Sequence, residues 1–173
     1  MALTKIGKEG ITGISNSANA TAITISADEE VTMPLQPAFL AGPSSDIANA
    51  ANGTTITLGT EIFDVGGNVA SNNFTAPVTG KYFLSYSVRM QEVDNGTSYI
   101  YIQTTTSNRN YFYIFAPDGF DQDAAFWTVS QSGIFDMDAG DTAALTFHFV
   151  NGNQSVDIRD FTNGTYFSGA LIC

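Results

Sequence analysis

The feature that most constrains this chain is a repeated alternation of short apolar-patterned segments and turns, which runs from residue 37 to the C-terminus. Turn residues recur about every 8–15 positions, the spacing typical of a β-sandwich. No stretch keeps apolar residues at i, i+3, i+4 and i+7, so an amphipathic helix is not expected. The sequence therefore predicts an all-β antiparallel sandwich. The turn signals are Asn52-Gly53, Asp94-Asn95-Gly96, Pro117-Asp118-Gly119, Asn151-Gly152 and Asn163-Gly164.

Strands are expected wherever β-branched and aromatic residues alternate with polar ones between these turns. Residues on alternate positions of a strand share one face, so the apolar half of each alternation predicts the core side. Tyr82, Leu84, Tyr86 and Val88 form one such core stripe, and Phe167 and Leu171 form another. The expected strands are 39–40, 54–58, 61–64, 81–90, 99–105, 110–115, 125–132, 143–150 and 166–172.

Residues 1–36 differ from the rest of the chain. They contain no aromatic residue, and the first is Phe39. Two short strands are expected at 22–26 and 30–33, and Pro34 and Pro37 mark a linker. Such a strip buries too little apolar surface to fold alone, so we predict an N-terminal attachment segment, residues 1–36, and a head domain, residues 37–173. The apolar residues that the strip offers are Ile6, Ile11, Ile14, Ile23 and Ile25.

The charge content limits the classes of partner. Charged residues make up 13% of the chain, against roughly 25% in an average soluble domain, and the formal net charge is −11. Binding to nucleic acid or to anionic lipid needs clustered cations, so neither is expected. No run of about 20 apolar residues is present, so no membrane insertion is expected. The start MALTKIGKEGITG lacks the apolar core of a signal peptide, which favours synthesis in a cytoplasm and release by lysis or within a particle.

Catalytic chemistry has little support in the sequence. His148 is the only histidine, and it alternates with Phe147 and Phe149, so it is expected to point away from the core. No Gly-x-Ser-x-Gly motif or phosphate-binding loop is present. The single cysteine, Cys173, excludes an intrachain disulfide. We therefore expect a non-enzymatic protein without a cofactor.

Calcium is the one metal that the sequence suggests. Asp118, Asp121 and Asp123 supply oxygen ligands at close spacing in PDGFDQDA, a pattern that calcium accepts. The EF-hand pattern fails, and turn chemistry alone explains Pro117-Asp118-Gly119. Solvated surface acids are thus the alternative interpretation of the same residues.

Three sequence blocks carry a family resemblance. EIFDVGGNVASNNFTAPVTGKYFLSYSV, residues 61–88, resembles the central signature of the C1q-like family. SGIFDMDAGDTAALTF, residues 132–147, is similar to the family's penultimate hairpin, and YFSGALI, residues 166–172, to its closing strand. The blocks occur in the family's order over about residues 37–173. The matching positions in the first block are Phe63, Asp64, Asn68, Phe74, Thr75, Pro77, Gly80, Tyr82 and Tyr86.

The resemblance implies a ten-strand jelly roll of the C1q/tumour-necrosis-factor type that forms a compact homotrimer, and some relatives bind calcium. Pro77 is suited to the start of a strand, and Gly80 to a turn that needs positive φ. The chain has more Tyr and Phe than a monomeric sandwich requires, which indicates a further apolar interface. The candidate residues for that interface are Tyr99, Tyr101, Tyr111, Phe112, Tyr113 and Phe115.

The N-terminal segment carries a second resemblance. Residues 4–33, TKIGKEGITGISNSANATAITISADEEVTM, resemble N-terminal stretches of marine bacteriophage tail-fibre and virion proteins. This implies a structural protein on a virion surface, made in the host cytoplasm and bound to capsid or tail proteins through residues 1–36. A capsid decoration or cement protein is the first hypothesis. A tail-fibre or knob protein that binds a host glycan or protein is the second, and a secreted cellular C1q-like adhesin is the third.

Overall fold

The computed structural model describes residues 23–25, 28, 30–152 and 156–173. The chain divides into two units, residues 1–34 and 35–173, which are described separately. In the first unit, β1 (Thr24–Ile25) pairs antiparallel with β2 (Val31–Thr32). The predicted N-terminal strand pair is thus confirmed, although each strand is shorter than expected. Ile6, Ile11 and Ile14 lie outside the described residues.

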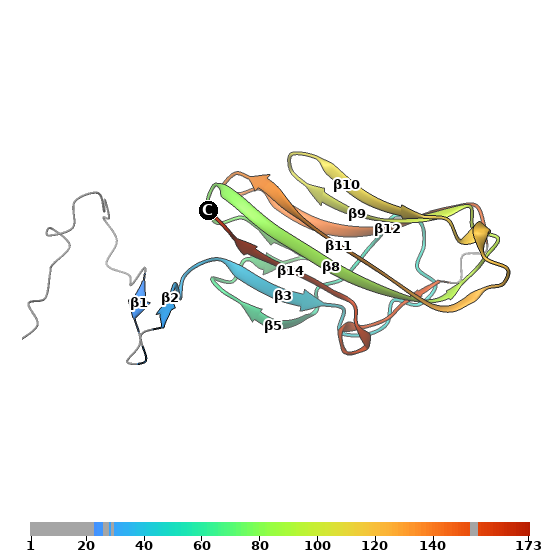
Figure 1. Ribbon diagram of the computed structural model, residues 1–173, viewed down its shortest axis with the longest axis horizontal. Helices are drawn as coiled ribbons and strands as arrows, with labels where there is room; N and C mark the ends of the chain where they lie inside the picture. Colours follow the sequence, from blue (N-terminus) through green and yellow to red (C-terminus); the bar gives the residue numbers. More distant parts are fainter. Residues whose placement is uncertain (1–22, 26–27, 29, 153–155) are drawn as a thin grey trace, which may run out of the picture. The chain divides into compact units, whose positions relative to one another are not determined.

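The second unit is a sandwich of two antiparallel sheets (Figure 1). The first sheet, called the β8 sheet, has the order β11-β8-β14-β3-β5, and the short β13 also pairs with β8. It places the first and last strands of the unit side by side, since Phe167 of β14 pairs with Ala41 of β3. The strands are β3 (Ala38–Gly42), β5 (Thr60–Asp64), β8 (Gly80–Val93), β11 (Ala124–Met137), β13 (Asp157–Ile158) and β14 (Tyr166–Leu171).

The second sheet, called the β9 sheet, has the order β10-β9-β12-β7-β6, and the short β4 pairs with β12. The strands are β4 (Thr54–Thr55), β6 (Val69–Ala70), β7 (Asn73–Thr75), β9 (Tyr99–Thr106), β10 (Asn110–Phe115) and β12 (Thr142–Val150). Two short 3-10 turns, Pro117–Gly119 and Phe161–Asn163, interrupt the loops of the unit. The prediction of an all-β antiparallel sandwich is confirmed.

The core lies between the sheets and follows the predicted alternation. Tyr82, Leu84, Tyr86 and Val88 are each at most 2% exposed, whereas Phe83 between them is 43% exposed. Phe147 and Phe149 are buried and His148 is only partly buried, as their alternation along β12 predicts. The face assignments made for β8, β12 and β14 are therefore confirmed.

Aromatic rings hold the two sheets together. The ring of Phe74 in the β9 sheet stacks on Phe39 in the β8 sheet at a centroid distance of 4.5 Å. Phe39 also meets Phe167 edge-on at 5.1 Å, and Phe74 meets Tyr82 at 5.5 Å. The Tyr82 hydroxyl donates to the carbonyl oxygen of Val78 at 2.7 Å, so this buried phenol keeps a partner.

The segment from Phe63 to Asn68 makes a tight, locally bonded turn. Asp64 Oδ2 accepts from the backbone N–H of Val69 at 2.8 Å, and Asn68 Nδ2 donates to the Val65 carbonyl at 2.7 Å. The intervening glycines have positive φ. These contacts explain why Asp64 and Asn68 stand in the first sequence block. Their side chains form hydrogen bonds with backbone groups of the turn that are not paired within a sheet.

Two details of the predicted strands are corrected. Gly80 is not among the residues with positive φ; a Cβ there would lie 2.5 Å from the Cys173 carbonyl oxygen, so close approach of the chain end requires the glycine. The strand predicted to end at 132 continues to Met137, because Gly133 stays in the ladder opposite Leu84. A glycine inside a strand is a poor stop signal when the partner strand supplies the pairing.

No helix in the part of the chain that the structure describes is long and apolar enough to cross a membrane.

Candidate functional site: an open aromatic edge

One side of the sandwich is formed by two edge strands, β10 of the β9 sheet and β11 of the β8 sheet. Within the described residues, β10 pairs only with β9 and β11 only with β8, so no backbone ladder closes this side. Side chains bridge it instead. Tyr111 meets Phe135 edge-on at 4.6 Å, and Phe115 stacks on Trp127 at 5.8 Å. We call this side, with Tyr111, Tyr113, Phe115, Trp127 and Gln131, the open edge.

The open edge exposes aromatic surface without charge. Tyr113 is 46% exposed and Trp127 is 38% exposed. From Asn110 to Phe115 and from Ala124 to Phe135, neither edge strand contains a charged residue or a proline. Soluble proteins protect long edge strands with charges, prolines or bulges, because free N–H and C=O groups pair with other chains. An unprotected pair of edges therefore indicates a surface that another molecule covers.

A buried tyrosine hydroxyl lies just inside the open edge. Tyr86 is 2% exposed, and its hydroxyl donates to Gln131 Oε1 at 3.2 Å. Burial raises the pKa of this phenol well above its usual range, and the neighbouring Tyr113 raises the pKa further. The hydroxyl is thus a neutral hydrogen-bonding group between the sheets and not a base.

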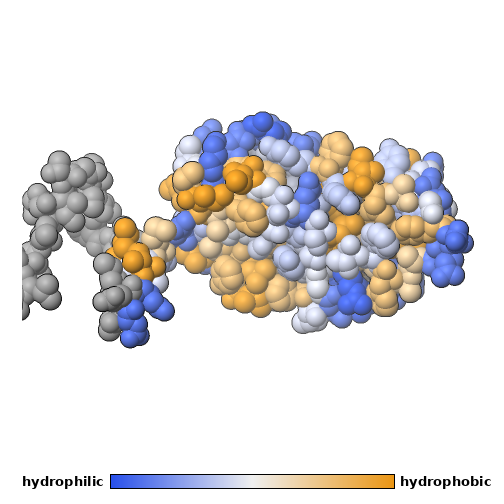
Figure 2. Space-filling view, viewed as in Figure 1, coloured by the Kyte–Doolittle hydropathy of each residue, from blue (hydrophilic) through white to orange (hydrophobic). Residues whose placement is uncertain are grey.

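The outer face of the β8 sheet is the second unusual surface. Its middle is a row of serines, and apolar side chains such as Phe83 and Ile134, which pair across β8 and β11, lie at one end. Arg89 is covered by the ring of Phe126, with its guanidinium carbon 4.5 Å from the ring centre. In Figure 2, hydrophobic and intermediate residues are mixed over the unit and hydrophilic ones gather toward its margins. The serines are Ser85, Ser87, Ser130, Ser132 and Ser168.

The structure separates the aromatic residues that the sequence grouped as one interface. Tyr111, Tyr113 and Phe115 belong to the open edge. Phe112 alternates with them on β10 and lies with Tyr99 and Tyr101 on the outer face of the β9 sheet. The sequence reasoning missed Trp127 and Gln131, although the charge-free run from Ala124 to Phe135 was a readable signal.

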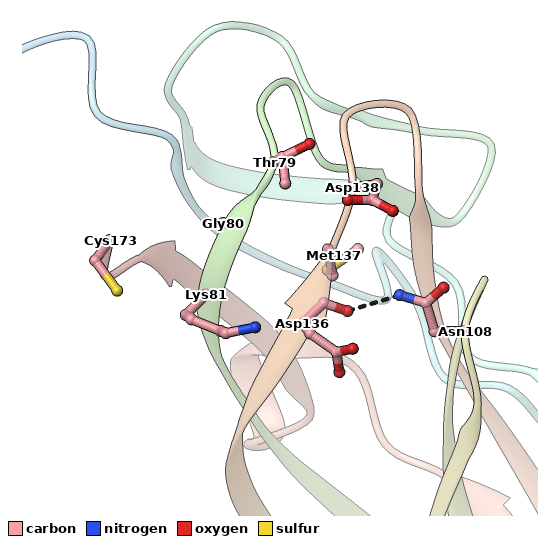
Figure 3. Close-up of a pocket in the computed structure, with 8 residues that line it drawn as sticks. All are labelled: Thr79, Gly80, Lys81, Asn108, Asp136, Met137, Asp138 and Cys173. Carbon is pink, nitrogen blue, oxygen red and sulfur yellow. Dashed lines mark hydrogen bonds between the residues drawn. The ribbon is translucent and has the colours of Figure 1, made fainter.

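The hollow that is drawn in Figure 3 lies at the end of β8 and β11 that is next to the C-terminus. Its volume is about 300 Å³. Asn108 Nδ2 donates to the Asp136 carbonyl at 2.9 Å, and the Asp136 carboxylate pairs with Arg109. Cys173 and Lys81 border the hollow, and no histidine is among its lining residues. It is lined by Thr79, Gly80, Lys81, Asn108, Asp136, Met137, Asp138 and Cys173.

The predicted calcium residues lie in the loop between β10 and β11. Asp118 belongs to the 3-10 turn, and Asp123 Oδ1 accepts from the backbone N–H of Asn95 at 2.9 Å. Asp121 and Asp123 line a shallow hollow together with Trp127. No group of three or more His, Cys, Asp or Glu side chains that could hold a metal occurs among the described residues. Calcium binding by Asp118, Asp121 and Asp123 stays a prediction.

The strand order and the connections define the class of this unit, an antiparallel two-sheet jelly roll of the C1q/tumour-necrosis-factor type. Among solved structures, the chain is similar to the globular domain of zebrafish complement 1qA protein, with a TM-score of 0.58 and 17% identity. That match covers 80% of this chain and 98% of the other. The chain is also similar to murine APRIL at pH 8.5 and pH 8.0, with TM-scores of 0.55 and 0.56 and 14% identity. These matches cover 79% of this chain and 99% of APRIL.

At these identities the likeness concerns the fold. No family model matches the sequence, and no curated protein matches it. The two-sheet jelly roll predicted from the three sequence blocks is thus confirmed by structures that share few residues with this chain. Its strand number is corrected, because the described residues of the second unit form twelve strands, β3 to β14, where the resemblance implied ten.

Proposed function

We propose that residues 35–173 form a homotrimeric, non-enzymatic head whose open edge packs on the neighbouring copy. The single observation that carries this proposal is the aromatic stretch of the open edge, residues 110–115 of β10 and 124–135 of β11, which contains no charged residue. A non-enzymatic role agrees with the fold, which is that of a non-enzymatic family, and homotrimers are typical of the C1q/tumour-necrosis-factor family.

The molecule offers a surface that complements this edge. The outer face of the β8 sheet is broad, and it combines small hydroxyl side chains with the exposed Phe83, Phe126 and Ile134. Small side chains let an aromatic edge approach closely, and hydroxyls satisfy polar groups such as the Tyr113 phenol. An edge that packs on a different surface of the next copy makes a head-to-tail contact, and such contacts close into rings.

Measuring the mass of the purified protein by light scattering tests the trimer. We expect about 55 kDa, three times the 18.4 kDa of one chain. Tyr113→Glu places a charge on the open edge and should give monomers. Ile114→Glu is the matched control, because Ile114 is 50% exposed on the same strand and faces the other way.

Two results would contradict this arrangement. A wild-type mass of one chain at micromolar concentration would remove the trimer. A trimer that survives Tyr113→Glu but not Ile114→Glu would place the interface on the outer face of the β9 sheet. Circular dichroism of both variants separates loss of assembly from loss of folding.

We further propose that the head stands on a virion surface, and that residues 1–36 attach it to capsid or tail proteins. The support is the resemblance of residues 4–33 to bacteriophage virion proteins, together with the division of the chain into two units at residues 34 and 35. Capsid decoration is the first candidate for this location. The aromatic outer face of the β9 sheet favours a second candidate, a tail-fibre or knob protein that binds a host surface.

A further inference from the structure

The outer face of the β9 sheet carries a cluster of aromatic rings, which we call the platform. The rings of Tyr101 on β9 and His148 on β12 stack with a centroid distance of 4.6 Å and an angle of 6°. The ring centroid of Tyr99 lies 6.3 Å from that of Tyr101, with an interplanar angle of 30°. The ring centroid of Phe112 on β10 lies 5.9 Å from that of Tyr101, with an interplanar angle of 58°. Three neighbouring strands, β10, β9 and β12 in Figure 1, thus bring four rings together. His148 covers one face of Tyr101, and Phe112, which is 54% exposed, is the most exposed ring of the four.

A shallow hollow of about 260 Å³ lies on this platform. Pockets for drug-sized ligands measure about 300–1,000 Å³, so this hollow suits a single small ring. Its lining combines aromatic and aliphatic surface with one amide and two phenol hydroxyls. Gln103 Nε2 donates to Thr105 Oγ1 at 2.8 Å, which fixes the orientation of the amide. The lining residues are Tyr99, Tyr101, Gln103, Phe112 and Ile114.

His148 supports the platform without adding charge. Asn52 Oδ1 accepts from the backbone N–H of Phe149 at 3.2 Å and lies 3.2 Å from His148 Nδ1, so Nδ1 is the protonated nitrogen that donates to it. Nε2 then accepts from the Thr146 hydroxyl at 3.1 Å. Burial lowers the pKa of His148, which keeps the ring neutral at neutral pH.

The lining selects the class of ligand. The lining has no cationic side chain that could bind a phosphate or a carboxylate, and it has no carboxylate that could bind an amine. Neutral pyranose rings have one face of axial C–H groups, which packs on the electron-rich face of an aromatic ring, and a rim of hydroxyls for amides and phenols. We propose that this hollow binds a neutral sugar residue of a glycan, with its C–H face on the exposed ring of Phe112, the Tyr101 ring beside it, and the Gln103 amide hydrogen-bonded to its hydroxyls.

This inference rests on the surface of one protomer and requires neither the trimer nor the virion location. A second copy of this chain is the competing occupant of the platform. Its packing would change the molecular mass, whereas a bound sugar would not. The two occupants are therefore separated by measuring mass and binding on the same samples.

The test uses the full chain and saturation-transfer nuclear magnetic resonance with methyl glycosides of glucose, galactose, mannose and N-acetylglucosamine. Saturation of aromatic protons should transfer to the C–H face of at least one sugar, with a Kd on the order of 1 mM. The same sugar should shift the side-chain amide resonance of Gln103. Phe112→Ala and Tyr101→Leu should each weaken binding by about tenfold or more.

Phe63→Ala is the matched control, since Phe63 is 47% exposed on the β8 sheet and should leave sugar binding unchanged. Absence of transfer to all four sugars overturns the proposal. Transfer that persists in both platform variants overturns it as well. A lower mass in Phe112→Ala would assign the platform to a second copy instead. Thermal unfolding of each variant shows that the fold is intact.

Discussion

At the scale of single residues, the core stripe decides stability. Tyr82 and Phe167 are fully buried and contact the stacked Phe39 and Phe74 rings. Tyr82→Ala or Phe167→Ala should lower the free energy of unfolding by about 3–5 kcal/mol, measured by urea denaturation. Phe63→Ala, at a position on β5 that is 47% exposed, is the control and should cost far less. A loss below about 1 kcal/mol at Tyr82 would mean that the site is not buried in solution.

A second residue-scale prediction concerns alkaline pH. Burial raises the pKa of Tyr86 in the folded state, followed in size by the effect of Tyr113. The folded protein therefore holds this proton more tightly than the unfolded chain, so stability is full below about pH 10 and falls as pH rises above it. As the pH is raised above about 10, the thermal unfolding midpoint of the Tyr86→Phe variant should fall less steeply than that of the wild-type protein. Equal slopes for both proteins would contradict the assignment.

At the scale of elements, β3 marks where the head begins. Gln36 Nε2 donates to the Leu171 carbonyl, and the Leu171 N–H donates to the Pro37 carbonyl at 2.9 Å. A fragment of residues 35–173 should therefore unfold cooperatively with a midpoint close to that of the full chain. A fragment that starts at residue 42 loses Phe39 and Ala41 from between β14 and β5, and should be unfolded. Disorder of the 35–173 fragment in circular dichroism would show that the N-terminal unit belongs to the core.

The elements also show where sequence patterns are reliable. The alternation in β8 and β12 predicted strand type and core face, because long strands with one buried face repeat their pattern several times. The two-residue β6 and β13 were not predicted, because such short strands exist only where a partner strand is already in place. The C-terminal end of β11 was predicted at residue 132 and lies at Met137. The error has the same reason, because pairing with β8 keeps Gly133 in the strand.

At the scale of the whole molecule, the attachment role of the N-terminal segment can be tested directly. Full-length protein added to particles assembled without it should bind, and the 35–173 fragment should not, as measured by co-sedimentation. The physical reason is that the segment contains apolar residues but no aromatic residue, so its sequence offers too little apolar surface to fold alone. A full-length variant with Ile6→Asp, Ile11→Asp and Ile14→Asp keeps the length of the segment but loses these apolar groups. This variant should also fail to bind. Equal binding by the fragment would move attachment to the head.

The sequence by itself determined the all-β class and the core faces, because these follow from local alternation and from turn residues whose backbone geometry few side chains can meet. The C1q-like jelly roll was indicated by the resemblance of the three sequence blocks to that family. It also indicated that the aromatic residues exceed what a core needs. Only the tertiary structure decided how that excess is divided. Strand order placed Tyr113 and Trp127 on one open edge and Tyr101 beside His148 on another face. Tyr113 and Trp127 lie on consecutive strands that belong to different sheets, and Tyr101 and His148 lie on strands that are separated in the sequence. Which strands become neighbours is a property that no local pattern contains.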